Sequence, residues 1–160
     1  MLFDLLRIFE RSPQLVSRLA PRVRPDDTPE DIVRKAREII ALMPERELVA
    51  TLNAHPRIGD DVRALSELSM REQGGERDPD VIAELARLND AYERTFGFRF
   101  VVFVNGRGKR ELIPVLRDRS TRTRESELRT GIEEFLAISL DRLERSQDDE
   151  AIHRAMDVDS

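Results

Sequence analysis

The residues best suited to carry chemistry lie in two short stretches near the middle of the chain. The first, Asn53-Ala54-His55-Pro56-Arg57-Ile58-Gly59, places a histidine directly before a proline. The second, Ser69-Met70-Arg71-Glu72-Gln73, places a carboxylate and an amide one helical turn after a serine. Imidazole titrates near neutral pH and a carboxylate can orient it. His55 and Glu72 therefore form a pair suited to proton transfer.

The local sequence indicates how these side chains are held. A proline disfavours helical geometry in the residue before it and is well tolerated in the first turn of a helix, so His55 is predicted at a loop-to-helix junction. If the second stretch is helical, Ser69, Glu72 and Gln73 share one face and can contact one ligand. The alternative is structural: a His-Pro turn, a capping serine and a solvated polar face.

Composition excludes several classes of function. The 160 residues carry 37% charged side chains of both signs and a net charge of -5, which predicts one soluble domain and no nucleic-acid partner. The chain has no cysteine and two histidines, so neither a disulfide framework nor a zinc site is expected, and catalysis is predicted to need no metal. No apolar run predicts a membrane span and no leader is apparent, so a cytoplasmic protein is expected.

Apolar residues at helical spacing predict an all-α fold. One helix is expected to begin at Ser12-Pro13. The other expected helices cover residues 2–9, Thr28-Pro29 to Met43, Pro44 to His55, Val81 to Gly97, Lys109 to Leu116, and about Arg122 through Leu143. Phe98 to Val104 is apolar and rich in β-formers but has no evident pairing strand, so a buried extended segment is predicted. Residues 1–146 are expected to form one domain, with residues 147–160 as an acidic, mobile tail.

The motifs together resemble one family, the 2-oxo-4-hydroxy-4-carboxy-5-ureidoimidazoline (OHCU) decarboxylases. The resemblance runs from about Leu2 to Arg145, in the order and with separations similar to those of the family. It rests on His55-Pro56-x-x-Gly59, Ser69-x-x-Glu72-Gln73, Leu88-Asn89-x-x-Tyr92, Phe96-Gly97-Phe98-x-Phe100-Val101, and Arg119 followed by Glu127.

This resemblance implies a helical homodimer that removes CO2 from the ureidoimidazoline to give (S)-allantoin in urate breakdown, with no cofactor. It implies that His55 and Glu72 are catalytic. The substrate-binding residues that it implies are Pro56, Ser69, Gln73, Arg119 and the main chain of Phe100, Val101 and Val102.

Some positions depart from the family pattern. Arg99 replaces a common proline, Ser120 and Arg122 replace a leucine and an asparagine, and Arg11-Ser12-Pro13-Gln14 stands for His-Ser-Pro-Trp. The pocket arginine is assigned to Arg119 by its spacing, with Arg122 as the alternative. A catalytically silent helical binding domain of the same ancestry is the competing interpretation, which the presence of His55, Glu72 and Arg119 disfavours.

Overall fold

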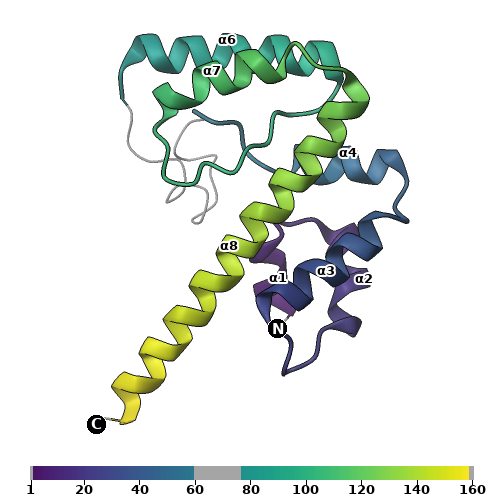
Figure 1. The fold of residues 1–160 in the computed structure, drawn as a ribbon, viewed down its shortest axis with the longest axis vertical. Helices are drawn as coiled ribbons and strands as arrows, with labels where there is room; N and C mark the ends of the chain where they lie inside the picture. The colour runs from purple at the N-terminus through teal and green to yellow at the C-terminus, as the bar shows by residue number, and fades with distance from the viewer. Residues whose placement is uncertain (1, 60–76, 159–160) are drawn as a thin grey trace. The chain divides into compact units, whose positions relative to one another are not determined.

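The regular secondary structure of the described residues is helical. The computed structural model describes residues 2–59 and 77–158, and within these ranges no strand occurs, which confirms the predicted all-α fold (Figure 1). The helices are α1 (Leu2–Ile8), α2 (Pro13–Leu19), the 3-10 helix η1 (Ala20–Arg22), α3 (Pro29–Ile40), α4 (Glu45–Asn53), α6 (Pro79–Phe96), α7 (Lys109–Arg119) and α8 (Arg124–Val158).

The chain forms two compact units. One contains residues 1–43 and 136–160, and the other contains residues 44–135. The sequence predicted one domain that ends at residue 146, but α8 continues without a break to Val158. The domain boundary at 146 and the mobility of the tail stay predictions. None of the described helices has the length and apolar character that crossing a membrane requires.

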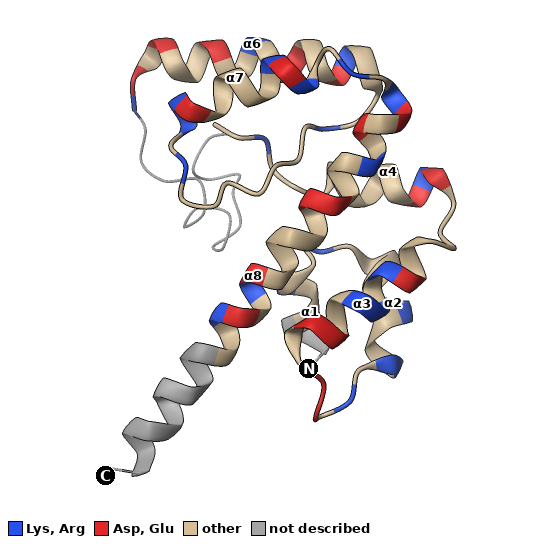
Figure 2. Ribbon diagram, in the orientation of Figure 1, with Lys and Arg blue, Asp and Glu red and all other residues tan. Residues whose placement is uncertain are grey.

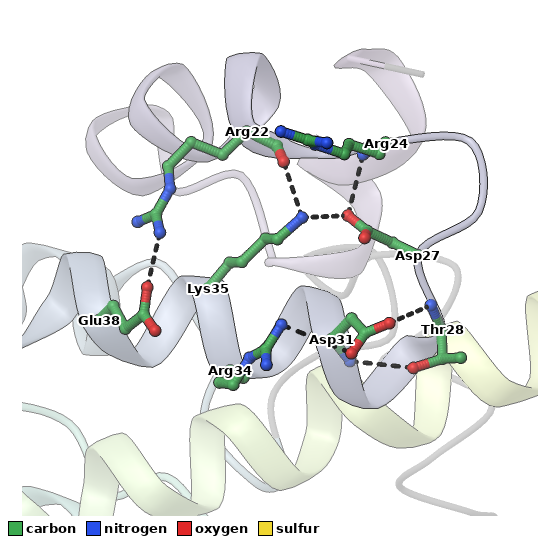
Figure 3. Close-up of polar contacts among 8 residues, drawn as sticks. All are labelled: Arg22, Arg24, Asp27, Thr28, Asp31, Arg34, Lys35 and Glu38. Carbon is green, nitrogen blue, oxygen red and sulfur yellow. Dashed lines mark hydrogen bonds and ion pairs between the residues drawn. The ribbon is translucent and has the colours of Figure 1, made fainter.

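In the first unit, α3 begins at the predicted capped start. Thr28 Oγ1 accepts a hydrogen bond from the Asp31 backbone N–H at 3.1 Å, and Asp31 Oδ2 accepts one from the Thr28 N–H at 3.0 Å (Figure 3). This capping box satisfies two N–H groups at the helix start, and Pro29 supplies the favourable backbone angle. Lys35 Nζ then donates to Asp27 and to the Arg22 carbonyl, which ties η1 to α3.

The end of α1 in the same unit is held by a buried ion pair. Arg142 Nη1 lies 2.7 Å from Glu10 Oε2 and donates to the carbonyls of Arg7 and Ile8. Glu10 and Arg11 both adopt positive φ, an uncommon backbone conformation for side-chain-bearing residues. Ser12 precedes α2 as predicted and is its N-cap residue by position, although its side chain makes no capping hydrogen bond.

The second unit is built around α6 and α7, which pack against each other. Acidic and basic residues occur together along α6, as Figure 2 shows. The helix ends at Gly97, whose φ of 83° is the left-handed conformation that glycine adopts at low cost. Phe98 to Val104 then runs as the predicted buried extended segment, and Asn105 and Gly106 turn the chain with positive φ.

Candidate active site

His55 lies just after the C-terminal end of α4. Ala54 caps the helix, and the His55 N–H donates to the Leu52 carbonyl at 3.1 Å. Pro56 disfavours helical geometry at His55, so the helix ends there, and no new helix begins within the described residues up to Gly59. The predicted junction is present but its direction was wrong, because His55 leads from a helix into a loop.

The imidazole of His55 is buried. Only 6% of the residue is exposed, and the ring meets the edge of Phe135 with centroids 5.3 Å apart and planes at 81°. An apolar wall on one side of an imidazole restricts its orientation and keeps bulk water away. A positioned imidazole is the side chain that most often serves as a general acid or base.

Helix α6 holds the loop that follows His55. Asn89 Nδ2 donates to the Ile58 carbonyl at 3.2 Å. Gly59 has a φ of 92°, and a Cβ there would lie 3.7 Å from a methyl group of Leu85. Glycine adopts this backbone conformation at low cost, whereas a residue with a side chain would be strained there, although its Cβ would make only ordinary contact with Leu85. Asn89 and Gly59, which belong to two separate motifs in the sequence, therefore both lie where the loop after His55 meets α6.

The extended segment supplies main-chain groups close to a buried cation. Phe100, Val101 and Val102 are 2–3% exposed, and the Val101 carbonyl accepts a hydrogen bond from Arg119 Nη1 at 2.6 Å. The Arg119 guanidinium also lies over the Phe100 ring, 4.6 Å from its centroid. Guanidinium groups bind favourably to aromatic faces in such an arrangement. The segment and Arg119 are therefore packed as one piece.

Arg119 is the centre of a buried hydrogen-bond network. Its Nε donates to Glu127 Oε1 at 2.8 Å, and the Tyr92 hydroxyl donates to the same oxygen at 2.6 Å. Burial, followed by the hydrogen bond to Glu127, raises the pKa of Tyr92 above its ordinary value. Among the described residues, Arg119 Nη2 has no hydrogen-bond partner. One donor of a buried guanidinium is thus left for another group.

Arg122, the alternative pocket arginine, has a different environment. Its side chain is 43% exposed and forms an ion pair with Asp118 at 2.9 Å. Its Nη1 lies 3.9 Å from Glu127 Oε2, too far for a hydrogen bond. Arg119 is therefore the interior arginine of this network, and Arg122 lies at its rim.

Glu134 is a titratable residue that sequence analysis missed. It is half-buried on α8, and burial raises the pKa of its carboxyl group, while nearby Arg119 and Arg107 and the Phe103 N–H act in the opposite direction. Glu134 lies two helical turns after Glu127 along α8, so both carboxylates are on one face of the helix. This spacing is the feature of the sequence that could have identified Glu134. Ser69, Glu72 and Gln73 lie outside the described residues.

One segment touches both His55 and the Arg119 network. Arg99 Nη1 donates to the His55 carbonyl at 2.8 Å, and two residues later the Val101 carbonyl binds Arg119. Pro56 lies partly exposed between His55 and the α6-bound loop. Within the described ranges, no cluster of three histidine, aspartate or glutamate side chains could hold a metal ion.

A family model of OHCU decarboxylases matches residues 3–144. The chain belongs to this family. It is 28% identical over 141 residues to the uric acid degradation bifunctional protein of Bacillus sp. (strain TB-90) and 30% identical over 140 residues to the uric acid degradation bifunctional protein PucL of Bacillus subtilis (strain 168). These alignments cover 86% and 85% of this chain but only 28% of each relative.

Solved structures show the same fold. An OHCU decarboxylase crystallised in the presence of (S)-allantoin matches with a TM-score of 0.71 and 21% identity, over 89% of this chain and 96% of that one. An (S)-allantoin synthase matches with a TM-score of 0.67 and 21% identity, over 89% of this chain and 48% of that one. The helical architecture is thus that of OHCU decarboxylases.

Proposed function

We propose that this protein catalyses the decarboxylation of 2-oxo-4-hydroxy-4-carboxy-5-ureidoimidazoline to (S)-allantoin in urate breakdown, without a cofactor. The observation that carries the proposal is the family match over residues 3–144, which includes His55 and Arg119. The two Bacillus relatives, which are uric acid degradation proteins by name, support the same pathway.

The proposed reaction needs two kinds of help. Breaking the bond between the carboxylate and the ring carbon releases CO2 and leaves an electron pair, which delocalises into the ring carbonyl and imine before the carbon takes up a proton. We infer that His55 and Glu72 bind the substrate hydroxyl and carry out the proton transfer, because an imidazole and a carboxylate can share a proton near neutral pH. The apolar neighbour Phe135 favours this role by limiting water around His55.

Arg119 is the proposed donor to the developing negative charge. A preorganised donor in a dry site contributes about 3 kcal/mol to transition-state stabilisation. Nη2 suits this role because it is buried and has no partner in the described part of the chain, while Nε and Nη1 hold the guanidinium in place. The remaining proposed substrate contacts are Pro56, Ser69, Gln73 and the main chain of Phe100, Val101 and Val102.

The assembly and location expected from the sequence also remain proposals. We expect a homodimer in the cytoplasm, with a small-molecule substrate and neither a nucleic-acid nor a membrane partner. Light scattering coupled to size-exclusion chromatography gives the mass in solution. A monomer at micromolar concentration would contradict the dimer without bearing on the reaction.

Circular dichroism tests the reaction directly. Urate oxidase and hydroxyisourate hydrolase generate the unstable substrate from urate, and the (S)-allantoin signal is followed with and without this protein. We expect the signal to grow faster than by spontaneous decay, in proportion to the protein added. Growth at the spontaneous rate would overturn the enzyme proposal and favour the silent binding domain. The variant His55→Asn, checked for folding, controls for contaminating activity.

A further inference from the structure

Arg99 donates two hydrogen bonds to the chain at and just before His55. The Arg99 backbone N–H donates to Asn53 Oδ1 at 2.9 Å, on the last residue of α4. The Arg99 guanidinium donates from Nη1 to the His55 carbonyl at 2.8 Å. One residue of the extended segment thus binds the chain just before His55 and at His55 itself.

Two acidic residues of α6 bind Arg57, which lies two residues after His55. Arg57 Nε donates to Glu93 Oε1 at 3.0 Å, its Nη2 binds Glu93 Oε2, and its Nη1 lies 2.9 Å from Asp90 Oδ1. Bidentate contacts between guanidinium and carboxylate groups fix orientation as well as distance. Arg99 Nε lies 3.7 Å from the same Glu93, so this carboxylate faces both arginines.

Both contacts require a backbone N–H and a side-chain donor at residue 99. A proline at residue 99 would have no N–H for Asn53 and no side-chain donor for the His55 carbonyl. The contacts also act at a sensitive place. Because the His55–Pro56 peptide is planar, a hydrogen bond that fixes the His55 carbonyl also fixes the plane that contains the His55 Cα, to which the imidazole side chain is attached.

We propose that Arg99 is a positioning residue for His55, acting through the His55 carbonyl with Glu93 and Arg57 as its support. The inference rests on the proposed function of His55, which Arg99 serves without touching substrate. The Arg99 side chain is 38% exposed, so its contribution to folding stability is small. Its contribution to turnover is larger, because a displacement of a catalytic group by about 1 Å can reduce the rate by about 100-fold.

The test compares Arg99→Ala, Arg99→Lys and the control Arg94→Ala. Arg94 is an exposed arginine on α6, so the control removes the same charge from an exposed position. We expect Arg99→Ala to lower kcat about tenfold with KM nearly unchanged and Tm close to that of the wild type. Arg99→Lys, which restores one donor, recovers most of the loss, and Arg94→Ala has no effect.

Nuclear magnetic resonance of labelled histidine gives a readout that does not depend on turnover. The chain has two histidines, and His153→Gln assigns their signals. We expect Arg99→Ala to shift or broaden the His55 imidazole signal and to leave that of His153 unchanged. If the His55 signal and kcat both match those of Arg94→Ala, the positioning role is wrong although the enzyme is active. If the wild type itself is inactive, the proposed function fails, and the His55 signal alone decides whether Arg99 positions the ring.

Discussion

A buried histidine must be replaced by a side chain of similar size if a substitution is to report on chemistry alone. His55 packs its ring against Phe135 and is almost fully enclosed. Truncation to alanine would remove a packed ring as well as a proton carrier and leave a cavity. Asparagine or glutamine retains part of the volume without an imidazole.

His55→Gln and Glu72→Gln should each lower kcat by about 100-fold or more, the usual range for a lost general acid or base. The double variant should lose about as much as either single variant, because groups that share one step are not additive. Initial rates of (S)-allantoin formation measure this. Losses that multiply cleanly would show that the two residues act in separate steps.

Arg119 requires a design that separates charge stabilisation from folding. Arg119→Ala leaves the buried Glu127 without its arginine partner, which lowers the free energy of unfolding by about 3–5 kcal/mol, so the alanine variant is combined with Glu127→Gln. We expect this double variant to lose about 100-fold in kcat. Arg119→Lys, which keeps the charge but loses the planar fork, should lie between it and the wild type.

The matched control for that series is Arg122→Ala. Its exposed ion pair with Asp118 contributes little to stability, so turnover and Tm should be close to wild type. Loss of turnover in Arg122→Ala together with normal kcat in the Arg119 variants would assign the pocket arginine to Arg122. Lower Tm with normal kcat in the Arg119 series would make Arg119 purely structural.

At the scale of elements, α6 anchors several parts of the second unit. Asn89, Tyr92 and Glu93 occupy positions i, i+3 and i+4, which lie on neighbouring parts of one helical surface. They contact the loop after His55, the carboxylate of Glu127 and the guanidinium of Arg57, respectively. A shift of α6 would therefore disturb the histidine loop and the arginine network together.

Tyr92 offers a direct probe of this element because it is the one tyrosine in the chain. Burial and Glu127 raise its pKa above the ordinary value of 10.0, so the folded protein favours the neutral phenol. Its contribution to stability is fully present below pH 10 and is lost as the pH rises through the folded-state pKa.

Absorbance of the tyrosinate follows this ionisation. We expect no native-state titration near pH 10 and a rise in absorbance only at higher pH or together with unfolding, monitored by far-ultraviolet circular dichroism. Tyr92→Phe should remove the tyrosinate signal and weaken the loss of stability at alkaline pH. A reversible titration near pH 10 in the folded wild type would contradict the buried hydrogen bond.

At the scale of the whole molecule, each compact unit has its own core and its own buried ion pair. Glu10 pairs with Arg142 in one unit, and Glu127 pairs with Arg119 in the other. Removing one partner of such a pair is more destabilising than removing a surface charge. The proposed catalytic residue His55 and the proposed substrate-binding residue Arg119 both belong to residues 44–135.

The whole enzyme is expected to work without a metal or a dissociable cofactor, because the ring carbonyl and imine of the proposed substrate can accept the electron pair. The protein is treated with a chelator for a prolonged time and then assayed alone on preformed substrate in metal-free buffer. We expect its rate of decarboxylation to be unchanged. Loss of activity that a divalent ion restores would contradict this prediction.

The sequence alone was enough to predict most of the described helices, the capped start at Thr28, the buried extended segment after Gly97 and the family, but neither η1 nor the continuation of α8 to Val158. These depend on interactions among near neighbours, such as proline geometry, capping and apolar periodicity, or on ordered motifs. Only the tertiary structure decided that Arg99 holds His55, that Tyr92 and Arg119 share Glu127, and that Arg142 holds the end of α1. Such partners are far apart along the chain, and packing, which local propensity does not encode, determines which of many possible charged pairs meet.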